Sequence, residues 1–217
     1  MEFMIRQFYE IPGKILTLNA GEYLFHEGDH AKYFFFVRSG QIFITKFAES
    51  GRVLSLRLAT KGSIIGELPL YEENPVYIFN AVAQSPAEVY AIEFPMLHSY
   101  LEKKPSLAIN LLKIISVHMR KQHSKFRDLV LYGKKGAIYS TLIRFANSYG
   151  QNVEDGILIT VPLTNQELAN YSATARECLN RMLSELRRKN VIEIRDVNFL
   201  KREIQCENCG REICNIE

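Results

Sequence analysis

Cysteine is scarce in this chain, with four residues in 217, and none precedes position 178. The first ten residues lack the basic-then-apolar pattern of a secretory signal. No uninterrupted apolar run approaches the roughly 20 residues needed to cross a bilayer. We therefore expect a cytoplasmic protein with no membrane partner. Because disulfides are disfavoured in a reducing cytosol, clustered thiols are interpreted first as metal ligands or redox groups.

The chain also lacks a strong excess of charge of either sign. Its formal net charge of +3 is too small to indicate nucleic-acid binding by itself. The basic residues are uneven, however, and many of them lie in the second half: Lys134, Lys135, Arg176, Arg181, Arg187, Arg188 and Lys189. A polyanionic partner is therefore expected to bind that half. A length of 217 residues with 47% apolar residues suits two modest domains.

From about Leu18 to Glu93 the sequence alternates short β-rich runs with glycines. Valine, isoleucine, tyrosine and phenylalanine recur at period two, as in "KYFFFVRSGQIFITKF". The glycines that separate the runs are Gly28, Gly40, Gly51 and Gly62. This pattern predicts an antiparallel barrel or roll of many short strands, with a generic β-sandwich as the alternative.

Pro105 begins a long run without glycine or proline that ends near Leu131, which predicts a long helix. Its apolar positions repeat at alternating spacings of four and three: Ala108, Leu112, Ile115, Met119, Phe126 and Leu129, with polar Gln122 in the same series. This heptad seam predicts a coiled coil between two subunits. A second stripe can lie on the β domain, formed by Leu107, Leu111, Ile114 and Val117. The alternative is a long helix buried within a monomer.

Gly133 and Gly136 interrupt that helix, and a second domain is expected to begin there. Residues 138–149 are typical of a short amphipathic helix, and "GILITVPL" is typical of a strand. "TNQE" at 164–167 has the form of a capping box, in which Thr164 and Glu167 satisfy each other's backbone amides.

The capping box opens a short helix that we expect to end near Asn170. After a four-residue turn, a longer amphipathic helix is predicted over 174–189, with Leu179, Met182, Leu183 and Leu186 on one side. "NVIEIRD" then returns the chain as a strand. Helix, turn, helix and strand together predict a winged helix-turn-helix.

The motifs "AGEYLFHEGD", "FFFVRSGQIFI", "GSIIGEL" and "TNQELANYSATARECLNRMLSELRRKNVI" resemble those of the CRP/FNR family of bacterial transcription regulators. The resemblance implies an α+β protein that is not an enzyme and that acts as a homodimer on double-stranded DNA, with RNA polymerase as a further partner. The implied parts are a cyclic-nucleotide-binding-type β-roll (1–104), a dimerisation helix (105–132), a winged helix-turn-helix (133–205) and a cysteine tail (206–217).

Family members that bind cyclic nucleotides carry an Arg and a Ser or Thr about ten residues after "GEL", which hold the cyclic phosphate. Here "GEL" is present at 66–68, but the later positions are Tyr77 and Ile78. A buried phosphate without a cation would be strongly penalised. We therefore expect that this roll does not bind a cyclic nucleotide.

"RECLNR" resembles the family's Arg-Glu-x-x-x-Arg reader, which implies recognition of a TGTGA-type palindrome. Arg176, Glu177 and Arg181 share one broad face of a helix, with Asn180 between them. Arginine can donate two hydrogen bonds to guanine, and glutamate can accept one from cytosine. Thr164, at the start of the preceding helix, is included among the expected DNA-binding residues. Ordinary solvated charges are the alternative.

The turn before this helix departs from the family's pattern. Ala173 stands where the family usually has glycine. A non-glycine residue held at positive φ would cost on the order of 1 kcal/mol.

Cys206, Cys209 and Cys214 form a Cys-x₂-Cys-x₄-Cys pattern short enough for three thiolates to meet at one centre. Soft thiolates favour iron-sulfur clusters, zinc or copper(I). Either a structural zinc or a [4Fe-4S] cluster would require a fourth, distant ligand. Cys178 is a poor candidate because it lies on the predicted recognition helix.

The tail resembles most closely that of the Bacillus-type Fnr oxygen regulators within the family. This resemblance implies a [4Fe-4S] cofactor, control of anaerobic genes, and Asp128 in "RDL" as the fourth ligand. The alternative for Asp128 is a surface carboxylate paired with Arg127 or Lys125. The alternative function is a zinc-stabilised or thiol-redox regulator of the same fold.

An enzyme with a cupin-like site would require a set of inward-facing ligands. The five histidines show no such spacing: His26, His30, His98, His118 and His123. They also give no positive support for a haem sensor.

Overall fold

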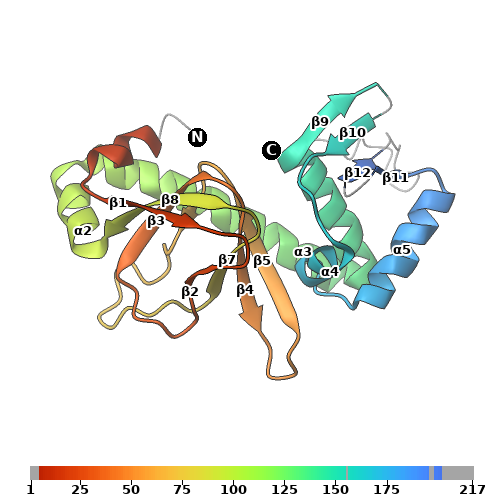
Figure 1. The fold of residues 1–217 in the computed structure, drawn as a ribbon, viewed down its shortest axis with the longest axis horizontal. Helices are drawn as coiled ribbons and strands as arrows, with labels where there is room; N and C mark the ends of the chain where they lie inside the picture. The colour runs from red at the N-terminus through yellow and green to blue at the C-terminus, as the bar shows by residue number, and fades with distance from the viewer. Residues whose placement is uncertain (1–4, 155, 196–197, 202–217) are drawn as a thin grey trace. The chain divides into compact units, whose positions relative to one another are not determined.

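The computed structural model describes residues 5–154, 156–195 and 198–201, with side chains as far as residue 193 (Figure 1). The chain divides into two compact units, Met1–Gln122 and His123–Glu217. Each unit is described below by itself.

The first unit is an antiparallel β-roll preceded by a 3-10 helix, η1 (Gln7–Glu10). Its strands are β1 (Lys14–Leu18), β2 (Tyr23–Phe25), β3 (Tyr33–Ser39), β4 (Ile42–Phe47), β5 (Val53–Ala59), β6 (Ile64–Ile65), β7 (Asn80–Ala83) and β8 (Ala87–Glu93). They form two four-stranded sheets with the orders β1-β8-β3-β6 and β2-β7-β4-β5. The predicted roll of short antiparallel strands is confirmed.

Glycine allows the tight reversal between β3 and β4. Gly40 has φ 81, a conformation that other L-residues rarely adopt. A Cβ at this position would also lie 2.5 Å from the Cα of Ala87. Only glycine therefore fits where this hairpin approaches β8.

One apolar core fills the roll and receives two helices. Aromatic residues dominate it, with Phe8, Phe34 and Phe36 fully buried. Helix α2 (Phe94–Lys103) begins with Pro95 in its first turn and buries Phe94, Leu97 and Leu101. The first part of helix α3 (Pro105–Tyr149) adds Leu107, Leu111 and Ile114 to the same core, as the second apolar stripe predicted.

Helix α3 is interrupted at one glycine. Gly133 has φ 60 and ψ −162, so the helix that starts at Pro105 ends before it and a second helix follows. The prediction that Gly136 shares in the break is wrong. A Cβ on Gly136 would meet the Cβ of Tyr132, so this glycine permits close packing just after the break.

The second unit contains the predicted winged helix-turn-helix. After the end of α3 come β9 (Gly150–Val153), β10 (Gly156–Ile159), α4 (Asn165–Tyr171), α5 (Arg176–Arg188), β11 (Ile192–Arg195) and β12 (Asn198–Lys201). The four strands form one sheet in the order β11-β12-β10-β9. α5 starts two residues later than the sequence predicted. Among the described residues, no helix is long and apolar enough to cross a membrane.

Candidate functional site

The helix-turn-helix begins with the capping box that the sequence predicted. The Thr164 hydroxyl accepts a hydrogen bond from the backbone N–H of Glu167 at 3.2 Å, and the Glu167 carboxylate accepts from the backbone N–H of Thr164 at 2.7 Å. That hydroxyl also donates to Glu167 Oε2 at 2.8 Å. Thr164 therefore acts within the protein as the N-cap of α4, a role that fixes where the motif starts.

The turn between α4 and α5 is tight. Ala173 has φ 53, so the non-glycine residue does adopt the left-handed conformation that its position suggested. Ser172 is buried, and its hydroxyl donates to the carbonyl of Leu168 at 2.8 Å. The backbone N–H of Thr174 donates to the carbonyl of Ala169 at 3.0 Å. These bonds fix the turn that follows α4.

Helix α5 has one buried face and one charged, exposed face. Leu179, Leu183 and Leu186 are buried, which anchors the helix in the core of the second unit. On the other side Arg176, Glu177 and Arg181 are all exposed. The helix thus presents the three predicted reader side chains together, in the half of α5 nearer its N-terminus.

Asn180 has a partner within the motif. Its side-chain oxygen accepts a hydrogen bond from the side-chain amide of Asn165 at 2.9 Å, and the residue is only half exposed. This bond joins the start of α4 to the middle of α5. Asn180 therefore helps to hold the two helices together, in addition to its predicted role toward DNA.

A buried charged cluster lies in the first unit at the "GEL" motif. Arg57 of β5 pairs with Glu67 at 3.1 Å and contacts Nδ1 of His118 on α3 at 2.9 Å. Burial raises the pKa of Glu67, but attraction to Arg57 and the hydrogen bond with His118 outweigh it, so the pKa is lowered overall. The Glu67 carboxylate is therefore ionised and bound by the protein's own side chains. We refer to Arg57, Glu67 and His118 as the GEL cluster.

Tyr77 occupies the interior of the roll near this cluster. Its ring is buried and stacks on Phe25 with ring centroids 3.7 Å apart. Its hydroxyl donates to the carbonyl of Tyr33 at 2.8 Å and accepts from the N–H of the same residue at 3.2 Å. Burial raises the pKa of Tyr77 to about 12, so the side chain stays neutral. Ile78, the next residue, is 41% exposed.

Asp128 lies in the second unit and is buried. Its side chain is 6% exposed, and its carboxylate pairs with Arg127 at 2.7 Å and with Arg144. The alternative of a surface carboxylate is therefore wrong, although the predicted partner Arg127 is confirmed. Arg144 also donates to the hydroxyl of Ser124 at 3.0 Å, so it joins the two helical parts of α3 on either side of Gly133.

Lys125 lies near this ion pair. Its ammonium lies 3.8 Å from the ring centroid of Tyr171, a cation–π geometry. Burial, with repulsion from Arg144, lowers the pKa of Lys125 to about 7. The neighbourhood of Asp128 is thus rich in basic side chains.

The predicted thiol ligands Cys206, Cys209 and Cys214 lie outside the described residues. Cys178 is half-buried on α5, as expected for a cysteine on the recognition helix. Within the part of the chain that the structure describes, no three His, Cys, Asp or Glu side chains gather in a group that could hold a metal ion.

Comparison with known proteins identifies both units. Residues 15–104 match the model of the cyclic nucleotide-binding domain, and residues 137–204 match that of the Crp-like helix-turn-helix domain. The chain is 45% identical over 220 residues to the Anaerobic regulatory protein of Bacillus subtilis (strain 168), across 96% of this chain and 92% of that protein. The chain belongs to the CRP/FNR family of transcription regulators. Members of this family bind DNA and are not enzymes.

Other relatives of this CRP/FNR regulator are more distant. The Global nitrogen regulator of Nostoc sp. (strain PCC 7120 / SAG 25.82 / UTEX 2576) is 24% identical, over 84% of this chain and 82% of that protein. Among solved structures, the c-di-GMP responsive global regulator CLP of Xanthomonas campestris superposes with a TM-score of 0.80 at 18% identity, over 94% of this chain and 100% of that one. FixK2 from Bradyrhizobium japonicum superposes with a TM-score of 0.76 at 16% identity, over 88% and 93%. These structures share the fold of this CRP/FNR protein.

Sequence reasoning did not assign roles to Arg57, His118 and Arg144. Arg144 lies 16 residues from Asp128, and His118 lies 51 residues from Glu67. No short motif links either pair. In the sequence Arg144 is marked only as a charged residue within the amphipathic pattern of residues 138–149, which does not indicate its partner.

Proposed function

We propose that this protein is an oxygen-responsive transcription regulator that binds a TGTGA-type palindrome as a homodimer and controls anaerobic genes together with RNA polymerase. A [4Fe-4S] cluster held by Cys206, Cys209, Cys214 and Asp128 sets the population of the DNA-competent dimer. The observation that carries the proposal is the 45% identity with the Anaerobic regulatory protein of Bacillus subtilis across nearly the whole chain.

The chemistry of the donor set supports this cofactor. Three thiolates and one carboxylate supply one ligand for each of four irons, and soft sulfur donors are those that iron-sulfur clusters use. When bound, such a cluster supplies a centre that oxygen can dismantle. The carboxylate is the hardest of the four donors, so we expect the bond from Asp128 to be the weakest.

Asp128 can serve as a ligand only by exchanging partners. Its carboxylate already forms ion pairs with Arg127 and Arg144. A thiolate-rich centre carries negative charge, and the arginines around Asp128 are placed to stabilise that charge. If Asp128 released Arg144, the Arg144 guanidinium would be free to bind that negatively charged centre.

Anaerobic purification of the full-length chain tests the cofactor. We expect a brown protein with visible absorption and about four irons and four sulfides per chain. Colourless, iron-free protein that still bound the palindrome under nitrogen would contradict the proposal. Zinc in place of iron, or activity that follows thiol oxidation alone, would establish the zinc-stabilised or thiol-redox alternative.

A pair of variants separates ligation by Asp128 from its structural role. Asp128→Ala and Arg144→Ala break the same ion pair, but only the first removes the carboxylate. We expect Asp128→Ala to lose most of its iron, whereas Arg144→Ala, which keeps the carboxylate ligand, loses much less. Equal iron content in the two variants would show that Asp128 is not a ligand.

The exposed face of α5 supports the DNA-binding half of the proposal. We expect Arg181→Ala to weaken binding to a TGTGA palindrome by about 1 to 3 kcal/mol, the value of a bidentate contact to guanine. Arg187→Ala is the matched control, since Arg187 is exposed at the other end of α5. Fluorescence anisotropy at one salt concentration measures the DNA affinity of both variants. Equal losses in the two variants would indicate phosphate contacts without base reading.

Large apolar side chains on α3 support the homodimer. Leu112 and Met119 of the predicted seam are 63% and 53% exposed, respectively, in the first unit. Exposed apolar side chains at heptad spacing are typical of a coiled-coil surface. We expect Met119→Glu to convert the dimer into monomers in sedimentation experiments, whereas Lys121→Glu does not. Dimers in both variants would place the subunit contact elsewhere.

A further inference from the structure

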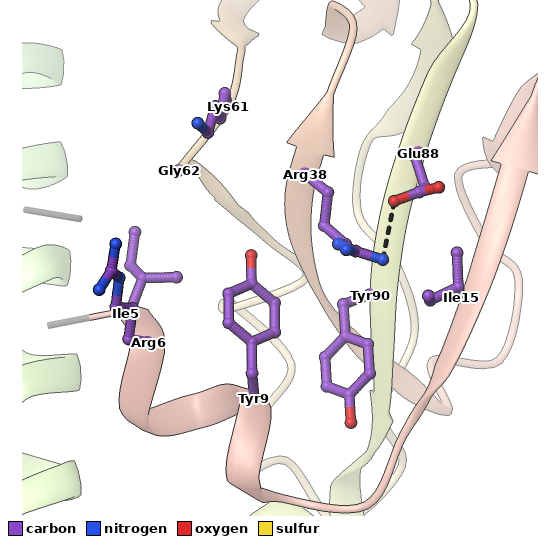
Figure 2. A pocket seen from close by; sticks show the side chains of 9 residues that line it. All are labelled: Ile5, Arg6, Tyr9, Ile15, Arg38, Lys61, Gly62, Glu88 and Tyr90. Carbon is purple, nitrogen blue, oxygen red and sulfur yellow. Dashed lines mark ion pairs between the residues drawn. The ribbon is translucent and has the colours of Figure 1, made fainter. Parts of the chain in front are cut away.

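A hollow of about 800 Å³ lies on the surface of the first unit, between η1 and the sheet that contains β8 (Figure 2). Its lining includes Arg6, Tyr9, Arg38, Lys61, Glu88 and Tyr90. None of these residues belongs to the GEL cluster. Ligand sites in proteins commonly enclose 300 to about 1,000 Å³, so this volume suits a small molecule.

Three cations from three separate segments line the hollow. Arg6 comes from the start of the chain, Arg38 from β3, and Lys61 from the turn before β6. The lining includes one carboxylate, Glu88, which pairs with Arg38 at 2.8 Å. Among the described lining residues, cations therefore outnumber carboxylates.

The ion pair with Glu88 positions Arg38. Figure 2 shows the Arg38 guanidinium held between β3 and β8, on the side of Tyr9 away from Arg6. One of its Nη atoms faces Glu88. A guanidinium carries five N–H donors in a fixed plane, so donors remain that can bind a second acid. Such a fork binds a phosphate group through paired, charge-assisted hydrogen bonds, as it does a carboxylate.

Two tyrosine rings that pack on each other form an aromatic wall of the hollow. The rings of Tyr9 and Tyr90 meet edge to face with centroids 5.3 Å apart. The ring centroid of Tyr9 also lies 6.0 Å from that of Phe36. The Tyr90 hydroxyl donates to the carbonyl of Ile11 at 2.6 Å, which fixes that ring. Tyr9 remains 39% exposed. A ligand ring can therefore stack here without the entropic cost of ordering the wall.

We propose that this hollow binds a small organic anion that combines a diphosphate or similarly charged group with a flat ring, the chemistry of a nucleoside diphosphate. Arg38 binds the charged group, Arg6 and Lys61 add positive charge to the lining of the hollow, and Tyr9 stacks on the ring. The hollow lies outside the interior of the roll that holds Tyr77. It does not depend on the function proposed above.

Calorimetry on the full-length chain tests the proposal with three probes. We expect ADP to bind saturably and more tightly than inorganic pyrophosphate, and adenosine to bind more weakly than either. Arg38→Gln should weaken ADP binding at least about tenfold, the effect of losing one strong charged contact. Tyr9→Ala should weaken ADP binding without changing that of pyrophosphate. Arg52→Gln, at an exposed arginine in the β4–β5 turn, is the matched control.

A second measurement locates the ligand. The chain contains no tryptophan, so Tyr9→Trp introduces a single tryptophan at the wall of the hollow while keeping an aromatic ring. We expect ADP to change its emission with the affinity that calorimetry gives. Absence of saturable ADP binding, binding that Arg38→Gln leaves unchanged, or binding without a change in Trp emission would each overturn the proposal.

Discussion

The carboxylate of Asp128 is bound by the guanidinium of Arg144, which lies 16 residues further along the chain and beyond the break at Gly133. Asp128 is almost fully buried, with a side-chain exposure of 6%, and Arg144 is 22% exposed. A buried carboxylate is stable in its charged form only if such a partner is present. The pair therefore holds together the two helical parts of α3 within the second unit.

Loss of Arg144 should destabilise the second unit. Because Arg127 would still bind Asp128, we expect Arg144→Ala to lower the free energy of unfolding by about 2 to 3 kcal/mol, somewhat less than for a buried charge left without any partner. Arg127→Ala, at a side chain that is 52% exposed, should cost less than about 1 kcal/mol. Urea unfolding of the full-length chain measures both. Equal costs would mean that the exposed Arg127 contributes as much as Arg144.

Lys125 should destabilise the fold below neutral pH. Burial and Arg144 lower its pKa to about 7 in the folded protein, whereas in an unfolded chain it stays protonated to about pH 10.4. The cost of burying the charge is therefore full below pH 7 and decreases as the pH rises from 7 toward 10. We expect Lys125→Met to stabilise the protein by about 2 kcal/mol at pH 6 and by less at pH 9.

Thermal unfolding of the parent and of Lys125→Met across this pH range provides the measurement. Lys121→Met is the control, since Lys121 is exposed on the same helix. A gain that did not change with pH would indicate better apolar packing rather than removal of a buried charge.

Glu67 should stabilise the roll in a pH-dependent way. Its pKa is lowered in the folded protein, so its contribution is present above the pKa of an unfolded glutamate and is lost as the pH falls through the folded value. We expect Glu67→Gln to cost about 2 to 3 kcal/mol at pH 7, because it leaves Arg57 buried without its carboxylate partner. The difference from the parent should shrink below about pH 4.

An exposed ion pair of the same unit provides the comparison for Glu67. Glu27 pairs with Lys46, and both side chains are well exposed. Glu27→Gln should cost less than about 1 kcal/mol at any pH. Urea unfolding at pH 7 and at about pH 3, below the pKa of an unfolded glutamate, tests the contrast, which disappears if the GEL cluster is not a network shielded from water.

Ala173 should limit the stability of the DNA-binding motif. Its φ of 53 is a conformation that glycine adopts without strain, so we expect Ala173→Gly to stabilise the second unit by about 1 kcal/mol. Asn190 has a similar φ of 55, but asparagine tolerates this region, so Asn190→Gly should change stability less. Thermal unfolding measures both, and a destabilised Ala173→Gly would show that the methyl group is needed in the turn.

The repeating patterns of the sequence were sufficient to predict the main elements. Period-two runs separated by Gly28, Gly40, Gly51 and Gly62 predicted the roll, and all four glycines adopt positive φ. The stripe of Leu107, Leu111 and Ile114 predicted the packing of α3 on the roll. The capping box at Thr164 predicted the start of α4, because capping depends on local hydrogen bonds that four consecutive residues can make by themselves.

Several elements have no clear local signal and were not predicted. η1, α2, β9 and β12 are short, between four and ten residues each. Helix α2 contains Pro95 in its first turn and ends just before Pro105. Strand β9 is exposed throughout, so it shows no alternation of buried and exposed positions. These segments are stabilised by their neighbours, which a local pattern does not contain.

The sequence by itself determined the family, the order of the elements and the side chains that α5 presents, because periodicity and motif spacing are properties of neighbouring residues. Only the tertiary structure decided the partners of the charges: Arg144 for Asp128, and Arg57 with His118 for Glu67. It also brought the three cations of the proposed anion site to one hollow. A buried charge selects its partner by proximity in three dimensions, and chain folding brings together residues that no sequence pattern relates.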